Sequence, residues 1–360
     1  MTVQATSHTK EEWYMTDELI AITVLWGFVF IYAVMATMDF GAGFWSMFYI
    51  NREKTKATNI ANRYLSPTWE VTNVFIVAIV VALVSFFPGA TFLLGTVLLV
   101  PGSIILLLLA IRSAFLVFAH IAKEYEKALT YISGISGIII PALLISVLPI
   151  THGGYIETID GVARLRMDRL FTSPHAYAFI GFAVSSTLFL SSLLLADYSN
   201  QANELEAYRI YRRDALILGP ISLIMAFFIV LTMRNEAMWL YERMINYFPW
   251  LIGSFCMFLI AGTALFLPST KHTSVRGKPR LAVIAIVIQY FLASYAYGKA
   301  HLPYMIYPDV TIQSAFTHPN TFRALFTSYI IGFAILFPGF IYFWRLFMKD
   351  RRYLQQNDQN

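Results

Sequence analysis

The chain has 360 residues, of which 58% are hydrophobic and only 13% are charged. This composition excludes an ordinary soluble domain, in which about 25% of residues carry charge. The net charge of +5 belongs to a chain of long apolar runs, so we attribute it to membrane topology and not to nucleic-acid binding. The single cysteine, Cys256, excludes an intrachain disulfide and a cysteine-ligated iron–sulfur cluster within this chain.

Nine apolar stretches are long enough to cross a bilayer, which takes about 20 residues each. We predict spans at 19–47, 70–88, 91–119, 131–150, 175–197, 215–232, 249–268, 281–298 and 325–347. No internal repeat is visible. The sequence therefore predicts one all-α polytopic membrane domain that covers residues 1–360.

Positively charged residues gather on one side of these nine spans. That side holds Lys and Arg clusters at 52–63, 123–127, 209–213, 271–280 and 345–352. Because cytoplasmic loops carry the excess of Lys and Arg, we predict that the N-terminus lies outside and the C-terminus lies in the cytoplasm.

The first span contains a carboxylate in the stretch MATMDFGAGFW. A charged residue at a helix centre costs roughly 2.5–3.5 kcal/mol on insertion scales. Asp39 therefore either reaches headgroups or a basic partner near the cytoplasmic edge, or serves as a proton-relay carboxylate. Gly41 and Gly43 follow it and would let a neighbouring helix approach closely.

A second carboxylate occurs at the start of the next predicted span, in RYLSPTWEVTNVF. Ser66 as N-cap and Pro67 as first helical residue would place Glu70 in the first turn, where the helix dipole favours an anion. Alternatively, Glu70 and Asp39 lie at similar depth on antiparallel helices and form a proton entry. Arg112, in the third span, either snorkels or pairs with one of these carboxylates.

Intramembrane haem usually takes an axial His or Met from a helix. None of the seven histidines falls in the middle of a predicted span. We therefore expect this chain by itself to bind neither haem nor metal.

Several motifs together resemble subunit II of the cytochrome bd-type quinol oxidases found in bacilli. Residues 36–43 read ATMDFGAG, similar to the family's D-G-F-D-x-G-x-G at the end of the first helix. Residues 67–75, PTWEVTNVF, are similar to the family's second-helix motif. A Phe-Pro hairpin at 87–88, Arg112, and HLPYMIYPDVTI at 301–312 complete the resemblance. The chain departs from the family at Ala36, where the first Asp is common.

The resemblance implies two four-helix bundles plus one peripheral helix, in the plasma membrane of a bacterium. It implies a respiratory complex that oxidises quinol and reduces dioxygen to water. Subunit I, the heterodimeric partner, would hold haem b and haem d, or b-type haem only, and a small third subunit is left open. This chain would carry no catalytic residue. It would supply a cytoplasmic proton pathway through Asp39, Glu70 and Arg112, while Trp69 would border a bound quinone or lipid.

Two other functions remain open from the sequence. Sparse intramembrane charges and glycine-interrupted helices also fit a proton- or cation-coupled secondary transporter, although nine spans without an inverted repeat disfavour it. A purely structural partner subunit is the second alternative, in which Asp39 and Glu70 only orient helices.

Overall fold

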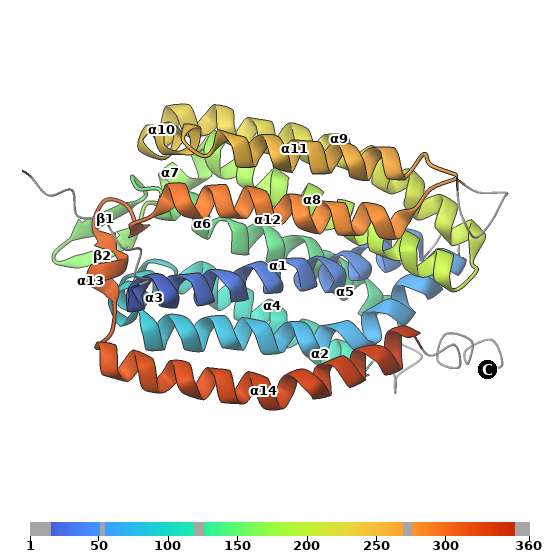
Figure 1. Cartoon of the computed structure of the whole chain (residues 1–360), viewed down its shortest axis with the longest axis horizontal. Coiled ribbons are helices and arrows are strands. Elements are labelled where there is room, and N and C mark those ends of the chain that lie inside the picture. The colour runs from blue at the N-terminus through green and yellow to red at the C-terminus, as the bar shows by residue number, and fades with distance from the viewer. Residues whose placement is uncertain (1–15, 51–54, 119–125, 269–275, 350–360) are drawn as a thin grey trace, which may run out of the picture.

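The computed structural model describes residues 16–50, 55–118, 126–268 and 276–349, and within them the chain is mostly helical. The long helices run side by side in one elongated bundle (Figure 1). The helices are α1 (Asp17–Tyr49), α2 (Thr55–Phe86), α3 (Pro88–Val97), α4 (Leu99–Phe118), α5 (Glu126–Ile145), α6 (Val147–Thr151), α7 (Met167–Thr172), α8 (Pro174–Gln201), α9 (Leu205–Glu236), α10 (Met238–Ile245), α11 (Phe248–Ala264), α12 (Pro279–His301), α13 (Ile312–Ala315) and α14 (Pro319–Lys349).

The helices confirm an all-helical polytopic membrane class. Among the described residues, six helices are long and apolar enough to cross a membrane, or up to eight if two bent pairs each count as one span. One bent pair joins α2 to α3 at 119°, and the other joins α10 to α11 at 79°. The number nine stays a prediction. The third predicted span, 91–119, is divided between α3 and α4, and its last residue lies outside the described part of the chain.

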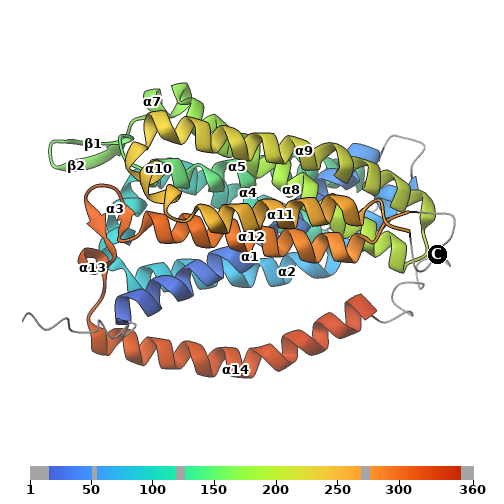
Figure 2. The ribbon, with the colours of Figure 1, turned by 45° about the horizontal axis from the view of Figure 1, so that its top comes forward.

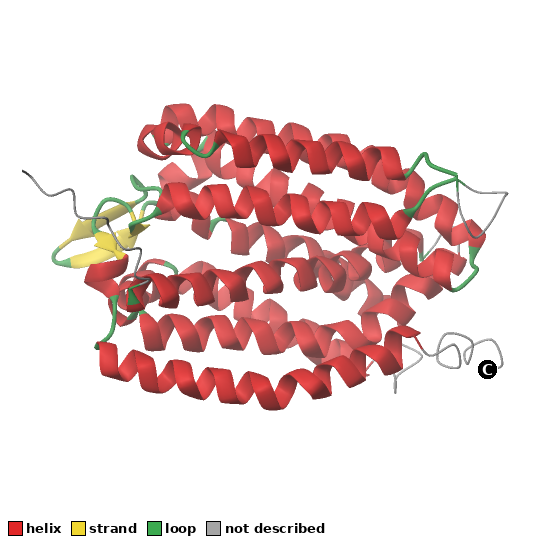
Figure 3. Ribbon diagram, viewed as in Figure 1, coloured by secondary structure: helices red, strands yellow, loops and turns green. Residues whose placement is uncertain are grey.

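Two short antiparallel hairpins gather at one end of the bundle, shown at the left of Figure 3. Strand β1 (Ile156–Ile159) pairs with β2 (Val162–Leu165), and β3 (Tyr304–Ile306) pairs with β4 (Val310–Thr311). Between β1 and β2, Asp160 and Gly161 both have positive φ, as a two-residue hairpin turn requires. We call this end of the molecule the hairpin end.

Helix α1 runs between α12 and α2 in Figure 1, and its second half is mostly buried, while α14 runs along one edge of the bundle (Figures 1 and 2). Helix α14 contacts its neighbours through aromatic rings: Phe322 lies 5.1 Å from Phe86 of α2, and Phe333 lies 5.4 Å from Phe28 of α1, between ring centroids. Large apolar side chains elsewhere on the surface are exposed, as expected of a protein that faces lipid.

The predicted start of the second helix is wrong. Helix α2 begins at Thr55, so Ser66 and Pro67 lie inside it and do not cap it. Burial explains the longer helix, because Ala57 and Ala61 are fully buried in the largest hydrophobic cluster. Packing of an apolar face stabilises helix beyond what local capping signals predict. Glu70 is therefore about four turns into α2, and the helix dipole no longer accounts for it.

Candidate functional site

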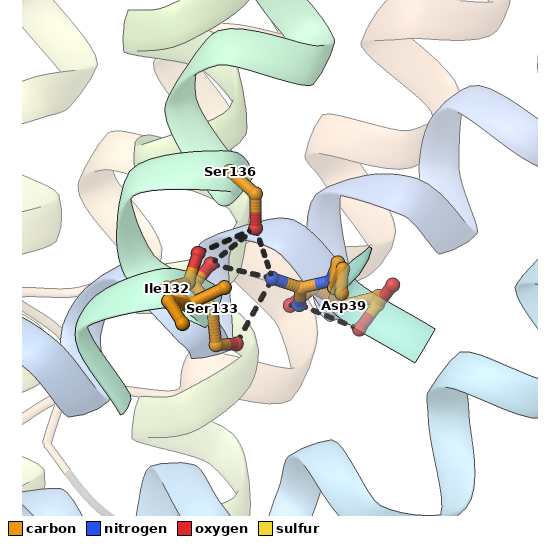
Figure 4. Close-up of polar contacts among 5 residues, drawn as sticks. Asp39, Ile132, Ser133 and Ser136 are labelled. Atoms are coloured by element: carbon orange, nitrogen blue, oxygen red, sulfur yellow. Dashed lines mark hydrogen bonds and ion pairs between the residues drawn. The ribbon is translucent and has the colours of Figure 1, made fainter. Parts of the chain in front are cut away.

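An ion pair between α1 and α4 lies inside the bundle (Figure 4). Arg112 Nη2 of α4 lies 2.9 Å from Asp39 Oδ1 of α1, and the two side chains are only 2% and 5% exposed. The same Nη2 donates a hydrogen bond to the Asp39 backbone carbonyl at 2.8 Å. Arg112 thus points into the bundle. Of the two alternatives predicted for it, snorkelling or pairing with a carboxylate, the structure shows the pairing.

Helix α5 completes the surroundings of the Arg112 guanidinium. Nη1 donates to the Ser133 carbonyl, to Ser133 Oγ at 2.9 Å and to Ser136 Oγ at 3.3 Å. The guanidinium carbon also lies 5.3 Å from the centroid of the Phe40 ring. A buried ion pair persists only when additional hydrogen bonds satisfy its remaining donors. Here oxygens of α1 and α5 accept from both terminal nitrogens, whereas the buried Nε has no partner among the described residues. Arg112 therefore keeps its place through contacts beyond the Asp39 carboxylate alone.

Three glycines let the helices around this ion pair approach closely. A Cβ at Gly43 would lie 2.6 Å from Ser133 Oγ and 3.0 Å from both Arg112 terminal nitrogens. A Cβ at Gly41 would lie 2.2 Å from the Ser191 side chain of α8, and one at Gly137 of α5 would lie 2.4 Å from the Phe40 carbonyl. A side chain at any of them would push helices apart or displace the guanidinium.

Two of the residues proposed from the sequence are placed only as backbone. Glu70 and Trp69 both lie within α2, and their side chains are outside what the structure describes. Their predicted roles in a proton path and beside a quinone stay predictions. The described site therefore consists of Asp39, Arg112 and the serines of α5.

A second polar cluster lies further along α1 and was not predicted. Tyr49 Oη donates to Asp214 Oδ2 of α9, and Arg213 Nη2 lies 2.8 Å from Asp214 Oδ1. One turn earlier, Ser46 Oγ donates to Asn62 Oδ1 of α2 at 2.5 Å. In the sequence, Asp214 follows two arginines and precedes a predicted span. That position is typical of a loop residue exposed to water. Its burial was therefore not visible in the pattern.

Three histidines gather at the hairpin end, which the sequence analysis also missed. His152 Nδ1 and His175 Nε2 lie 3.0 Å apart, and the His152 ring centroid lies 5.7 Å from that of His301. A signal did exist: His152 follows the fourth predicted span and His175 begins the fifth, so both belong at the same membrane surface. Among the described residues, no group of three or more His, Cys, Asp or Glu is arranged to hold a metal ion.

The fold and this site define a class: a multi-pass membrane protein with a buried carboxylate–guanidinium pair joining its helices. The sequence profile of the family described as cytochrome bd terminal oxidase subunit II matches residues 17–347. The chain therefore belongs to that family, which confirms the resemblance drawn from the motifs. Membership makes it a membrane subunit of a respiratory oxidoreductase.

Two relatives cover nearly the whole chain. The protein described as putative cytochrome bd menaquinol oxidase subunit II of Bacillus subtilis (strain 168) is 71% identical over 343 residues, which are 95% of this chain and 99% of that protein. The structure of bd oxidase from Geobacillus thermodenitrificans contains a chain with a TM-score of 0.79 and 36% identity, and the match covers 93% of this chain and 99% of that one.

Proposed function

We propose that this chain is the haem-free subunit II of a cytochrome bd-type oxidase that oxidises quinol and reduces dioxygen to water. It scaffolds subunit I and supplies that subunit with protons from the cytoplasm. Family membership supports the oxidase complex, and the name of the Bacillus subtilis relative supports menaquinol as the substrate class. The predicted orientation, nine spans, and arrangement as two four-helix bundles plus a peripheral helix belong to the same proposal.

The haem groups, b and d or b-type only, belong to the partner subunit in this proposal, where they supply the electron transfer and dioxygen chemistry. Two of the described histidines, His152 and His175, fit haem poorly as ligands. Both ring nitrogens of His152 and of His175 already have hydrogen-bond partners. An axial ligand needs one nitrogen free to face iron.

The single observation that carries the proton path is the Asp39–Arg112 pair. Reducing dioxygen consumes protons, and hydrocarbon offers no group that can carry them. Arg112 holds one carboxylate oxygen of Asp39 at 2.9 Å, while the other oxygen points away from the guanidinium in Figure 4. That second oxygen is the atom that takes up and releases a proton.

The serines of α5 keep the arginine in place while Asp39 is neutral. When Asp39 is protonated, the guanidinium loses its counter-charge but keeps its bonds to Ser133 and Ser136. The site therefore does not have to rearrange between the two protonation states, which favours rapid transfer. Glu70, on the neighbouring helix α2, is the second carboxylate of the path, and Trp69 beside it borders a quinone or lipid.

The test is Asp39→Asn in the assembled oxidase, with Asp197→Asn as the matched control. Asn keeps size and hydrogen bonding but exchanges no proton, so we expect quinol-driven oxygen consumption to fall by roughly tenfold or more, about 1.4 kcal/mol of barrier. Glu70→Gln should have a similar but milder effect. Asp197 pairs at 3.2 Å with Arg280, whose side chain is exposed, and lies outside the Asp39–Arg112 site, so its variant should turn over normally.

The haem spectrum separates the alternatives. Full turnover by an assembled Asp39→Asn complex with normal haem content contradicts the proton path. Loss of the complex in this variant supports instead the structural role of Asp39. Purification of the chain without any haem-bearing partner would favour the transporter.

A further inference from the structure

Two of the three histidines at the hairpin end, His152 and His175, form an unbroken hydrogen-bonded chain across several helices. His175 Nδ1 of α8 bonds Thr232 Oγ1 of α9 at 2.9 Å, and its Nε2 meets His152 Nδ1 at 3.0 Å. His152, at the end of α6, bonds Tyr297 Oη of α12 with its Nε2 at 2.6 Å. Both imidazoles are buried, with 2% of His152 and none of His175 exposed. The ends of α6, α8, α9 and α12 are thus joined through these two rings.

A carboxylate ties the same region to the loop that follows α6. Glu236, the last residue of α9, accepts hydrogen bonds from Tyr155 Oη and Ser173 Oγ, each at 2.7 Å, and from the His175 backbone N–H at 3.2 Å. Ser173 also caps α8 through the Ala176 N–H at 3.0 Å. Burial raises the pKa of Tyr155 to about 12, so its hydroxyl stays a donor to Glu236 at neutral pH.

The contact between the two rings limits how many protons they can hold. A neutral imidazole has one N–H and one bare nitrogen, whereas a protonated ring has an N–H at both positions. The 3.0 Å contact therefore needs one donor and one acceptor. When both rings are protonated, two N–H groups point at each other and the bond is lost. The pair can accept at most one added proton without breaking.

The charged and titratable groups around the pair disfavour a second positive charge. His301 of α12 donates from Nδ1 to the Tyr304 carbonyl at 2.7 Å, and its buried Nε2 has no partner among the described residues. Two arginines lie near these histidines. The guanidinium carbon of Arg243 in α10 lies 5.6 Å from the centroid of the Trp239 ring, and that of Arg169 in α7 lies 5.6 Å from the centroid of the Tyr155 ring. Glu236, which accepts from the His175 backbone N–H, is the carboxylate beside the pair, and its negative charge acts in the opposite sense to these cationic groups.

Burial, with His301 and His175 nearby, lowers the pKa of His152 well below its usual range. We call the arrangement with the His152–His175 contact intact the closed form. It binds protons more weakly than an arrangement in which the two rings are separated and exposed to water. The stability of the closed form is fully present at neutral pH and falls as the pH drops below the ordinary histidine value of about 6.5.

We propose that His152 and His175 form one proton-binding site at the hairpin end, and that protonation separates the ends of α6, α8, α9 and α12. The charge count predicts that this end faces outside, where the site would respond to external acidity. The site lies apart from Asp39 and does not depend on the proton path proposed for that residue.

The test is amide hydrogen exchange of the intact oxidase complex in lipid nanodiscs at a pH of about 7.5, 6.5 and 5.5, corrected for the intrinsic pH dependence of exchange. We expect the amides of peptides that cover 147–156 and 173–178 to exchange faster as the pH falls below 6.5. For each histidine that titrates, the corrected exchange rate should rise by up to about tenfold per pH unit. Peptides of α1 around Asp39 should show no such increase.

Glutamine at either position keeps a polar side chain but cannot titrate, so His152→Gln and His175→Gln should each flatten the response. His318→Gln is the matched control, because the His318 ring lies outside the network and accepts a hydrogen bond from the Asn320 N–H at 3.3 Å. Equal protection of the wild-type complex at all three pH values overturns the proposal, and that comparison needs no variant. A response that persists in both assembled glutamine variants also overturns it.

Discussion

Arg112 connects three helices through one guanidinium, which makes the residues around it sensitive to small changes. It belongs to α4, pairs with Asp39 of α1 and bonds Ser133 and Ser136 of α5. Truncating one partner of a buried pair, so that its hydrogen bonds are lost together with its charge, costs about 3–5 kcal/mol. The space that holds the guanidinium in this position depends on Gly43.

Gly43→Ala tests the close packing around Arg112 by adding a single Cβ atom to α1. The added methyl group would overlap Ser133 Oγ and crowd Arg112, so we expect the complex to lose about 1–3 kcal/mol of stability, seen as a lower thermal unfolding midpoint and reduced oxygen consumption. Gly27→Ala is the matched control in the same helix, because a Cβ at that position would have nothing within 4 Å. Unchanged stability and activity in Gly43→Ala would contradict the packing described here.

The chemistry of single residues was only partly predictable. Asp39 and Arg112 could be identified as candidates because a charge inside an apolar run is energetically costly. Their similar predicted depths in the membrane made an ion pair one of the alternatives. Ser133 and Ser136 gave no signal, because serines are common within spans and nothing in their spacing indicates an arginine on another helix. The His152–His175 contact depends on how α6 and α8 meet, which a linear pattern does not specify.

The length of each apolar stretch predicted where the long helices lie in the sequence, but it did not predict the residues at which they begin and end. Every predicted span falls mostly on helical residues, whereas α2 begins 15 residues before its predicted span, at Thr55. Ser66 and Pro67 are a common start signal that packing overrode. Tyr211 of α9 helps to hold the early part of α2, since its buried hydroxyl donates to the Ala57 carbonyl at 2.6 Å.

Tyr211→Phe should loosen this part of α2 without unfolding the rest. Loss of one buried hydrogen bond costs about 1–1.5 kcal/mol, so amide exchange of a peptide that covers 55–62 should accelerate by roughly tenfold. Tyr342→Phe on α14, where the side chain is 71% exposed, should exchange like the wild type. Unaltered exchange at 55–62 in Tyr211→Phe would mean that this bond does not support the extension.

At the scale of the whole molecule, the predicted orientation is accessible to labelling. In a variant without Cys256, a cysteine replacing Ile159 in the β1–β2 hairpin should react with an impermeant thiol reagent only from outside. A cysteine replacing the exposed Glu206, at the start of α9 on the opposite end, should react only from the cytoplasm. The reverse pattern would invert the topology and place the proton path on the wrong side.

The central claim is that Asp39 carries protons from the cytoplasm to the oxidase, and proton uptake itself tests it most directly. The complex is reconstituted in vesicles, and a pH indicator on the cytoplasmic side reports uptake during a single turnover with dioxygen. We predict that Asp39→Asn slows this uptake by about the same factor as steady-state oxygen consumption, roughly tenfold, with haem content unchanged. Uptake at the wild-type rate in an assembled Asp39→Asn complex would contradict the account.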